Sequence, residues 1–200
     1  MRRPILLVIA ILALAGGALA WWVMKEEPLD CCAPPGKNLA LPEEPPLPAL
    51  AGRTILAGCR QGECSWMRIG EVTRAVTVPQ GELRRMIVER GSSVHLDGNL
   101  PERAEGTQIE WEAGTRSDYA FCSIERPAYA FEDEGGLITH YLDLYDLAGY
   151  QTSSGRLYMR LCHDVDEEVP DAATLGRFGY RPGTRSEQIE GATPEDMTRF

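Results

Sequence analysis

The stretch that most constrains the fold is Arg53–Ile69, RTILAGCRQGECSWMRI, in which two apolar runs flank a short polar loop. A cysteine stands at each edge of that loop, and apolar runs around a short turn predict a β-hairpin. With a four-residue loop, Arg60–Glu63, Cys59 lies opposite Cys64 and both side chains share one face of the hairpin. The spacing therefore predicts a disulfide across the two strands.

A second register of this hairpin is open from sequence. In the first register Trp66 lies opposite Ala57, which places a large side chain over a small one. A three-residue loop that ends in a bulge at Gly62 would instead pair Cys59 with Glu63. The second cysteine would then point to the opposite face, because a shift of one residue reverses every side chain of a strand. The first register is favoured because it gives both cysteines and the tryptophan consistent positions.

The N-terminal segment, residues 1–24, begins with two arginines and continues as an uncharged apolar run of 21 residues. A helix of that length spans the hydrocarbon core of a bilayer. Ala18–Ala20 also fits a signal-peptidase site, whereas Trp21 and Trp22 suit the interfacial aromatic belt of an uncleaved anchor. We expect a signal-anchor in the inner membrane with the N-terminus cytoplasmic, or a signal peptide cleaved after Ala20. Both alternatives place the remaining chain in the periplasm.

Residues 25–50 form a proline-rich linker, because frequent prolines exclude a helix or a central strand. The linker contains Cys31 and Cys32, and the whole chain has six cysteines. An even number of cysteines in an exported chain predicts disulfides. Adjacent cysteines rarely bridge each other. Cys31 and Cys32 could therefore form disulfides with other cysteines of the chain, form a disulfide with a second molecule, or remain as reactive thiols.

Residues 51–165 are predicted to form one exported β domain, and residues 166–200 an acidic, loosely structured tail. Short runs with β-branched or alternating residues recur between turn signals, and they include Leu137–Leu147 and Arg156–Cys162. The pattern contains no convincing amphipathic helix. It predicts a mostly β fold, an antiparallel β-sandwich or small barrel stapled by disulfides. Cys122 and Cys162, both in late strands, are predicted to form a second disulfide.

Charge and motif content exclude several functions. The net charge is −10, which makes nucleic acid a poor partner. The histidines and cysteines lack the spacing of a zinc site or a haem attachment motif, and the acidic run after His163 lacks the glycine of a calcium loop. We expect no metal and no other cofactor. The sequence also lacks a nucleophile elbow and a glycine-rich phosphate loop.

An alternative function is that of an envelope hydrolase that uses Asp or Glu as its catalytic groups. Such an enzyme needs one buried acid facing another across the substrate. No context in the sequence singles out one of the available acids. They are Glu110, Glu112, Asp118, Asp143 and Asp146.

Tyrosines supply the candidate binding surface. Tyr141 and Tyr145 share a face of a predicted strand, and Tyr150 and Tyr158 flank the loop that follows. If no second sheet covers this face, the four rings offer contact area at low entropic cost. The sequence thus predicts a non-enzymatic envelope domain that binds a protein or a glycan, with the membrane as its other partner. A thiol- or metal-handling protein that uses Cys31 and Cys32 is a further alternative.

Overall fold

The computed structural model describes residues 47–133, 135–165 and 169–199. The predicted membrane segment 1–24, most of the linker 25–50 and the pair Cys31–Cys32 lie outside these ranges. Within the described ranges no helix is long and apolar enough to cross a membrane.

One antiparallel sheet of eight strands makes up most of the described chain. The strands follow the order β1-β2-β3-β5-β6-β7-β8, and β4 also pairs with β3. Strand β3 accommodates two neighbours on one side, because β5 pairs with its first half and β4 with its last residues. The strands are β1 (Thr54–Arg60), β2 (Glu63–Val78), β3 (Gly81–Val94), β4 (Glu110–Trp111), β5 (Arg116–Cys122), β6 (Ala128–Asp133), β7 (Gly136–Tyr141) and β8 (Glu187–Glu190).

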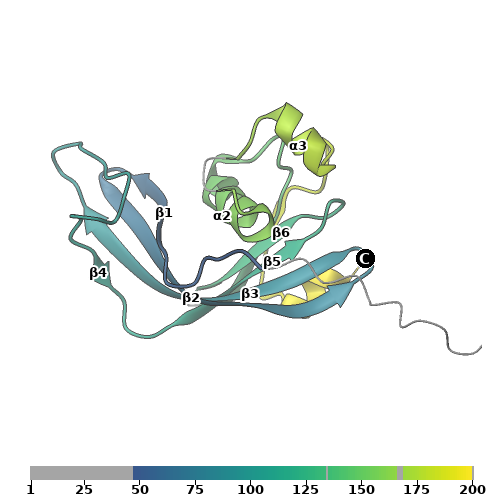
Figure 1. Cartoon of the computed structure of the whole chain (residues 1–200), viewed down its shortest axis with the longest axis horizontal. Helices are drawn as coiled ribbons and strands as arrows, with labels where there is room; N and C mark the ends of the chain where they lie inside the picture. The colour runs from purple at the N-terminus through teal and green to yellow at the C-terminus, as the bar shows by residue number, and fades with distance from the viewer. Residues whose placement is uncertain (1–46, 134, 166–168, 200) are drawn as a thin grey trace, which may run out of the picture. The chain divides into compact units, whose positions relative to one another are not determined.

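The sheet curls around a helix. Helix α2 (Thr152–His163) follows a short 3-10 turn, η1 (Gly149–Gln151), and contacts β5, β6 and the distant edge strand β1. Strands β2 and β3 lie between β1 and β5 in the sheet, so one helix can contact β1 and β5 only if the sheet bends around it. Figure 1 shows α2 on the inner side of this bend. Leu157 and Leu161 of α2 pack there with Ile55 in the main hydrophobic core.

The hairpin of β1 and β2 has the predicted cysteine pairing. Cys59 lies opposite Cys64, with a Cα–Cα distance of 4.0 Å, and the two form a disulfide. Arg60 and Glu63 continue the ladder, so the loop is shorter than predicted and consists of Gln61 and Gly62. Both loop residues have positive φ, 54° and 82°, as the favoured two-residue hairpin turns require.

The predicted partner of Trp66 is wrong by one residue. Trp66 lies opposite Leu56, and an irregularity between Leu56 and Gly58 leaves Ala57 without a partner in the ladder. A β-bulge of this kind adds one residue to a strand. The alternating pattern alone does not report an extra residue, so the sequence could not locate the bulge.

The second predicted disulfide is also present. Cys122 at the end of β5 is joined to Cys162 near the end of α2. This bond attaches the helix to the sheet beside the main core. The surrounding core includes Tyr129, Leu142 and Tyr158, which are almost completely buried.

The prediction of a mostly antiparallel β fold is confirmed, but the finer prediction of a sandwich or small barrel needs correction. The described strands form a single curled sheet that does not close, since β1 and β8 are the two ends of the strand order. Helix α2 occupies the place that a second sheet would take in a sandwich. An amphipathic helix can bury the inner face of a curved sheet as well as another sheet can.

The predicted strand Arg156–Cys162 is helical. It belongs to α2, whose buried face includes Leu157, Tyr158 and Leu161. These positions fit the helical period of 3.6 residues, but the run is short enough to be mistaken for a strand. Gly155 allows the helix to approach Leu147 closely, because a β-carbon at this position would overlap the leucine side chain.

The predicted strand Leu137–Leu147 ends earlier, at Tyr141. Beyond it the carboxylate of Asp143 accepts hydrogen bonds from the backbone N–H of Tyr145 at 3.1 Å and of Gly183 at 2.8 Å. This turn replaces the strand, as aspartate side chains commonly do when they bond to nearby backbone groups. Leu142 stays buried although it lies outside the ladder.

The C-terminal segment is not a loose tail within the residues that the structure describes. Residues 169–199 form helix α3 (Ala172–Phe178), strand β8 and a 3-10 turn, η2 (Pro194–Thr198). Strand β8 extends the sheet beside β7, and Met197 is fully buried in a second, smaller core. The folded domain therefore extends well beyond residue 165. Helix α3 and strand β8 are too short for their periodicity to show in the sequence.

Candidate binding groove

A groove of ≈ 1240 Å³ lies between the edge of the sheet and α2. Its walls come from the start of β1, from the loop residues 102–105 and from two arginines of α2. The lining residues are Gly52, Arg53, Thr54, Ile55, Leu56, Trp66, Glu102, Arg103, Ala104, Glu105, Arg156 and Arg160.

Arginine is the most frequent charged residue of the groove. Arg156 and Arg160 stand one helical turn apart on α2 and therefore point to the same side. Arg53 and Arg103 contribute two further guanidinium groups, against two glutamates, Glu102 and Glu105. The groove is thus locally basic in a chain whose net charge is −10.

Backbone groups of an edge strand form one side of the groove. Strand β1 has β2 as its only strand partner among the described residues. The N–H of Ile69 donates to the carbonyl of Arg53 at 2.9 Å, which directs that carbonyl toward β2. Because backbone groups alternate in direction along an antiparallel strand, those of Thr54 and Leu56 point away from β2. They are the hydrogen-bonding groups that an edge strand presents to a new partner.

A chain of hydrogen bonds holds the hairpin and the following loop together. The indole N–H of Trp66 donates to the hydroxyl of Ser93 at 2.8 Å, and the same hydroxyl lies 2.8 Å from Nε2 of His95. The N–H of His95 donates to the carbonyl of Gly62 in the hairpin turn at 2.7 Å. Further along, Thr107 bonds through its N–H to the carbonyl of Ala104 at 3.0 Å. The disulfide-closed hairpin thereby fixes where the loop that walls the groove begins.

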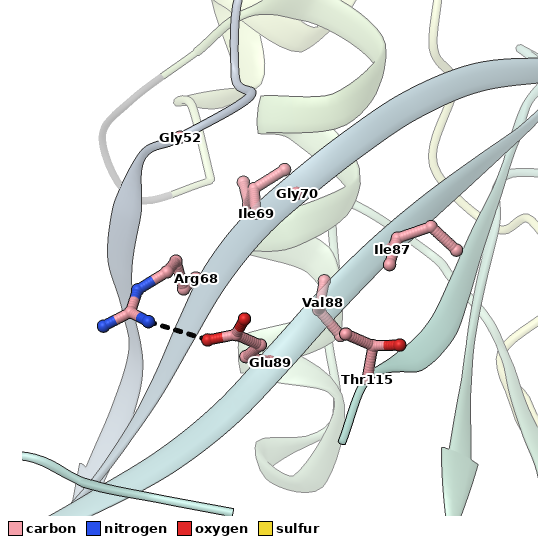
Figure 2. A pocket seen from close by; sticks show the side chains of 8 residues that line it. All are labelled: Gly52, Arg68, Ile69, Gly70, Ile87, Val88, Glu89 and Thr115. Carbon is pink, nitrogen blue, oxygen red and sulfur yellow. Dashed lines mark hydrogen bonds and ion pairs between the residues drawn. The ribbon is translucent and has the colours of Figure 1, made fainter. Parts of the chain in front are cut away.

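A smaller pocket of ≈ 220 Å³ lies across β2 and β3 and shares Gly52 with the groove. Figure 2 shows Arg68 and Glu89 facing each other at its rim, where they form an ion pair of 2.7 Å. Arg68 also stacks over the ring of Trp111, 4.1 Å from the ring centre. The aliphatic floor and this internally paired rim leave little room for a polar ligand, so we assign no site to it.

The structure does not bring the four predicted binding tyrosines onto one exposed surface. Tyr158 is fully buried in the core, and Tyr141 is 2% exposed. Tyr145 is half-buried, and its hydroxyl donates to the carbonyl of Tyr180 at 3.2 Å. Only Tyr150 of the four is well exposed, at 58%. The prediction failed because the loop after β7 folds inward and α2 lies over the sheet.

Tyr158 belongs to a hydrogen-bonded chain that the sequence did not reveal. Its hydroxyl donates to the carbonyl of Ser123 at 3.1 Å and lies 2.8 Å from the hydroxyl of Tyr180. That hydroxyl is 2.6 Å from Nε2 of His163. Each hydroxyl has one proton to donate, so the order that satisfies every bond runs from His163 through Tyr180 and Tyr158 to Ser123. Burial raises the pKa of Tyr180 to about 12 and that of Tyr158 well above its usual value, so both act as neutral donors.

Acidification is expected to destabilise the domain through its buried histidines. Burial lowers the pKa of His163, with Arg84 adding to the effect, and burial also lowers the pKa of His140. The unfolded chain, with histidine pKa values near 6.5, therefore takes up protons at a higher pH than the folded chain. Stability should fall as the pH drops through about 6.5. Thermal unfolding midpoints measured between pH 7.5 and 5.5 would test this, with His163→Gln expected to flatten the dependence. A midpoint that rises on acidification over this range would contradict it.

His140 is a buried histidine of β7 whose two ring nitrogens both have side-chain partners. Its Nδ1 lies 2.8 Å from the hydroxyl of Ser154, and its Nε2 lies 3.0 Å from the amide oxygen of Gln188. A serine, a histidine and an orienting amide resemble the parts of a hydrolase centre. Both His140 and Ser154 are only 4% exposed, and neither lines the groove or the smaller pocket. We interpret the trio as a structural network that joins β7, α2 and β8.

Among the carboxylates of the hydrolase hypothesis, Asp118 has the most unusual environment. It is 1% exposed, accepts a hydrogen bond from Tyr129 at 2.6 Å and pairs with Arg90 at 2.7 Å. Burial raises the pKa of Asp118, and the neighbouring Arg90 opposes that rise. Asp118 does not line the groove. The other four candidates, Glu110, Glu112, Asp143 and Asp146, do not line it either.

No group of three His, Cys, Asp or Glu side chains in the described part of the chain is placed to hold a metal ion. Comparisons with protein-family models, with curated proteins and with solved structures found no match to this chain. The functional argument therefore depends on the groove itself.

Proposed function

We propose that this chain is a membrane-tethered binding protein of the cell envelope, whose periplasmic domain receives a partner in the groove between β1, residues 102–105 and α2. The observation that carries the proposal is the composition of the groove. It combines the apolar side chains of Ile55, Leu56 and Trp66 with several arginines and with an edge strand that has outward-pointing backbone groups. Binding sites typically join an apolar surface to a few directed polar groups in this way.

Two further features support export and tethering. The apolar segment 1–24 and the proline-rich linker 25–50 have the composition of an anchor and a spacer. The disulfides Cys59–Cys64 and Cys122–Cys162 suit an oxidising compartment such as the periplasm. A linker of this kind would let the domain reach a partner at some distance from the membrane.

Site-specific photocrosslinking in living cells tests the proposal. A photoreactive residue at Ala104, which lines the groove, is expected to give a discrete crosslinked product of the full chain. The matched control places the same residue at Val76, which is exposed near the far end of β2 and does not line the groove. The Arg103→Glu substitution should lower the yield of the crosslinked product formed from position 104.

Protease treatment of spheroplasts tests the location. The folded domain should be degraded only after the outer membrane is opened, while the inner membrane is still intact. A domain that resists protease until the inner membrane is lysed would contradict export. Equal crosslinking from Ala104 and Val76, or none from either, would contradict a binding role for the groove.

A further inference from the structure

We infer that the groove binds an extended acidic peptide segment, which adds to the outer edge of β1 as a new strand. The inference rests on the proposed function and specifies the chemistry of the partner. It combines the direction of the edge-strand backbone with the charges on the two sides of the groove.

The backbone of β1 sets the binding mode. Thr54 and Leu56 direct their N–H and C=O groups away from β2 and line the groove. Arg156 and Arg160 of helix α2 and residues 102–105 line the groove together with this edge. An extended peptide in the groove would satisfy the edge groups by main-chain hydrogen bonds, as in other cases of strand addition.

The two walls determine what the side chains of an added strand would meet. Ile55 packs with Leu157 of α2 in the main core, so the face of β1 that carries Ile55 and Arg53 is turned toward α2. Side chains of a strand alternate between faces. Every second side chain of the added strand would therefore approach Arg156 and Arg160. The intervening side chains would approach the mixed charges of residues 102–105.

Carboxylates are the groups that best complement the α2 wall. Arg53, Arg156 and Arg160 already interact with other parts of the chain. A guanidinium group has five N–H donors in a planar fork, so it can bind an additional carboxylate beside an existing partner. Basic peptides would meet the same arginines as like charges. The preferred segment thus carries acidic residues at alternate positions.

Titration of the full chain in detergent with a synthetic peptide tests this inference. The probe is a capped seven-residue peptide that alternates threonine with glutamate. Two matched peptides carry glutamine or lysine in place of glutamate. We expect the glutamate peptide to bind about tenfold or more tightly than the glutamine peptide, because charge-assisted hydrogen bonds are stronger than neutral ones. The lysine peptide should not bind. Added salt should lower the affinity of the glutamate peptide, because salt screens the attraction between opposite charges.

Hydrogen exchange distinguishes strand addition from simple charge attraction. The bound glutamate peptide should slow the exchange of the Thr54 and Leu56 amides, whereas the amide of Ile55, already bonded to β2, should change little. Thr54→Pro removes one edge donor without removing a bond to β2, so it should weaken binding, while Thr54→Val should not. Unfolding midpoints of both variants show whether the proline has damaged the fold, and the exchange result on the unaltered chain is independent of that outcome.

Three results would overturn the inference. They are equal binding of the glutamate and glutamine peptides, binding without protection of the edge amides, and no binding of the glutamate peptide. If Ala104 still gives its crosslinked product in cells in any of these cases, the binding function of the groove stands and the strand-addition chemistry is wrong.

Discussion

Replacing both Cys122 and Cys162 with serine is expected to lower the free energy of unfolding by about 4 kcal/mol. The two residues are 40 positions apart in the sequence, and closing a loop of that length removes substantial entropy from the unfolded chain. For a protein of this size the loss corresponds to a fall in unfolding midpoint of roughly 8–16 °C. Urea denaturation of the oxidised protein and of the double variant would measure it.

The hairpin disulfide provides the matched control. Cys59 and Cys64 are only 5 positions apart, so replacing both with serine should cost about 2 kcal/mol in the same entropic model. The comparison to make is between the losses in free energy of unfolding of the two double variants. A larger loss from the hairpin pair would show that the loop-entropy argument does not describe this domain.

Replacing Asp118 with alanine is expected to destabilise the domain by about 3–5 kcal/mol. The substitution leaves the guanidinium of Arg90 without its carboxylate and the hydroxyl of Tyr129 without its acceptor. Tyr129 is 1% exposed, so water cannot replace the lost acceptor without rearrangement. Thermal or urea unfolding of Asp118→Ala beside the unaltered protein would give the loss.

Two conservative variants separate the charge from the hydrogen bonds. Asp118→Asn keeps an oxygen acceptor for Tyr129 and should lose less stability than Asp118→Ala. Tyr129→Phe removes only one hydrogen bond and should cost about 1–2 kcal/mol. If Asp118→Ala lowers the free energy of unfolding by no more than Tyr129→Phe does, the ion pair with Arg90 contributes little to stability.

The structure buries two of the four tyrosines that were predicted to form a binding surface. A strand with aromatic residues on one face suggested an exposed binding surface, but Tyr141 and Tyr158 are buried. Tyr141 is instead flanked by two guanidinium groups, those of Arg126 at 4.5 Å and Arg185 at 4.3 Å from its ring. These contacts depend on segments far apart in the sequence, so the strand pattern could not reveal them. We therefore propose the groove, which is open and lined by charged side chains, as the binding site in place of this surface.

Features that depend on local geometry were accessible from the sequence. The hairpin, its cysteine pairing and the β-rich character follow from residues a few positions apart, where alternation and turn residues act directly. The pairing of Cys122 with Cys162 was predicted by assigning both cysteines to late strands, and the disulfide is present although Cys162 lies in helix α2. The structure contains both disulfides and a mostly antiparallel sheet.

Features that depend on packing between distant segments were decided by the tertiary structure alone. Whether Arg156–Cys162 forms a strand or a helix depends on which surface buries Leu157 and Leu161, and the curled sheet provides a surface that fits a helix. The groove gathers Arg53, residues 102–105 and Arg160 from three separate parts of the chain. Their proximity results from the bend of the sheet around α2, and a bend is a collective property of many strands that no short sequence pattern records.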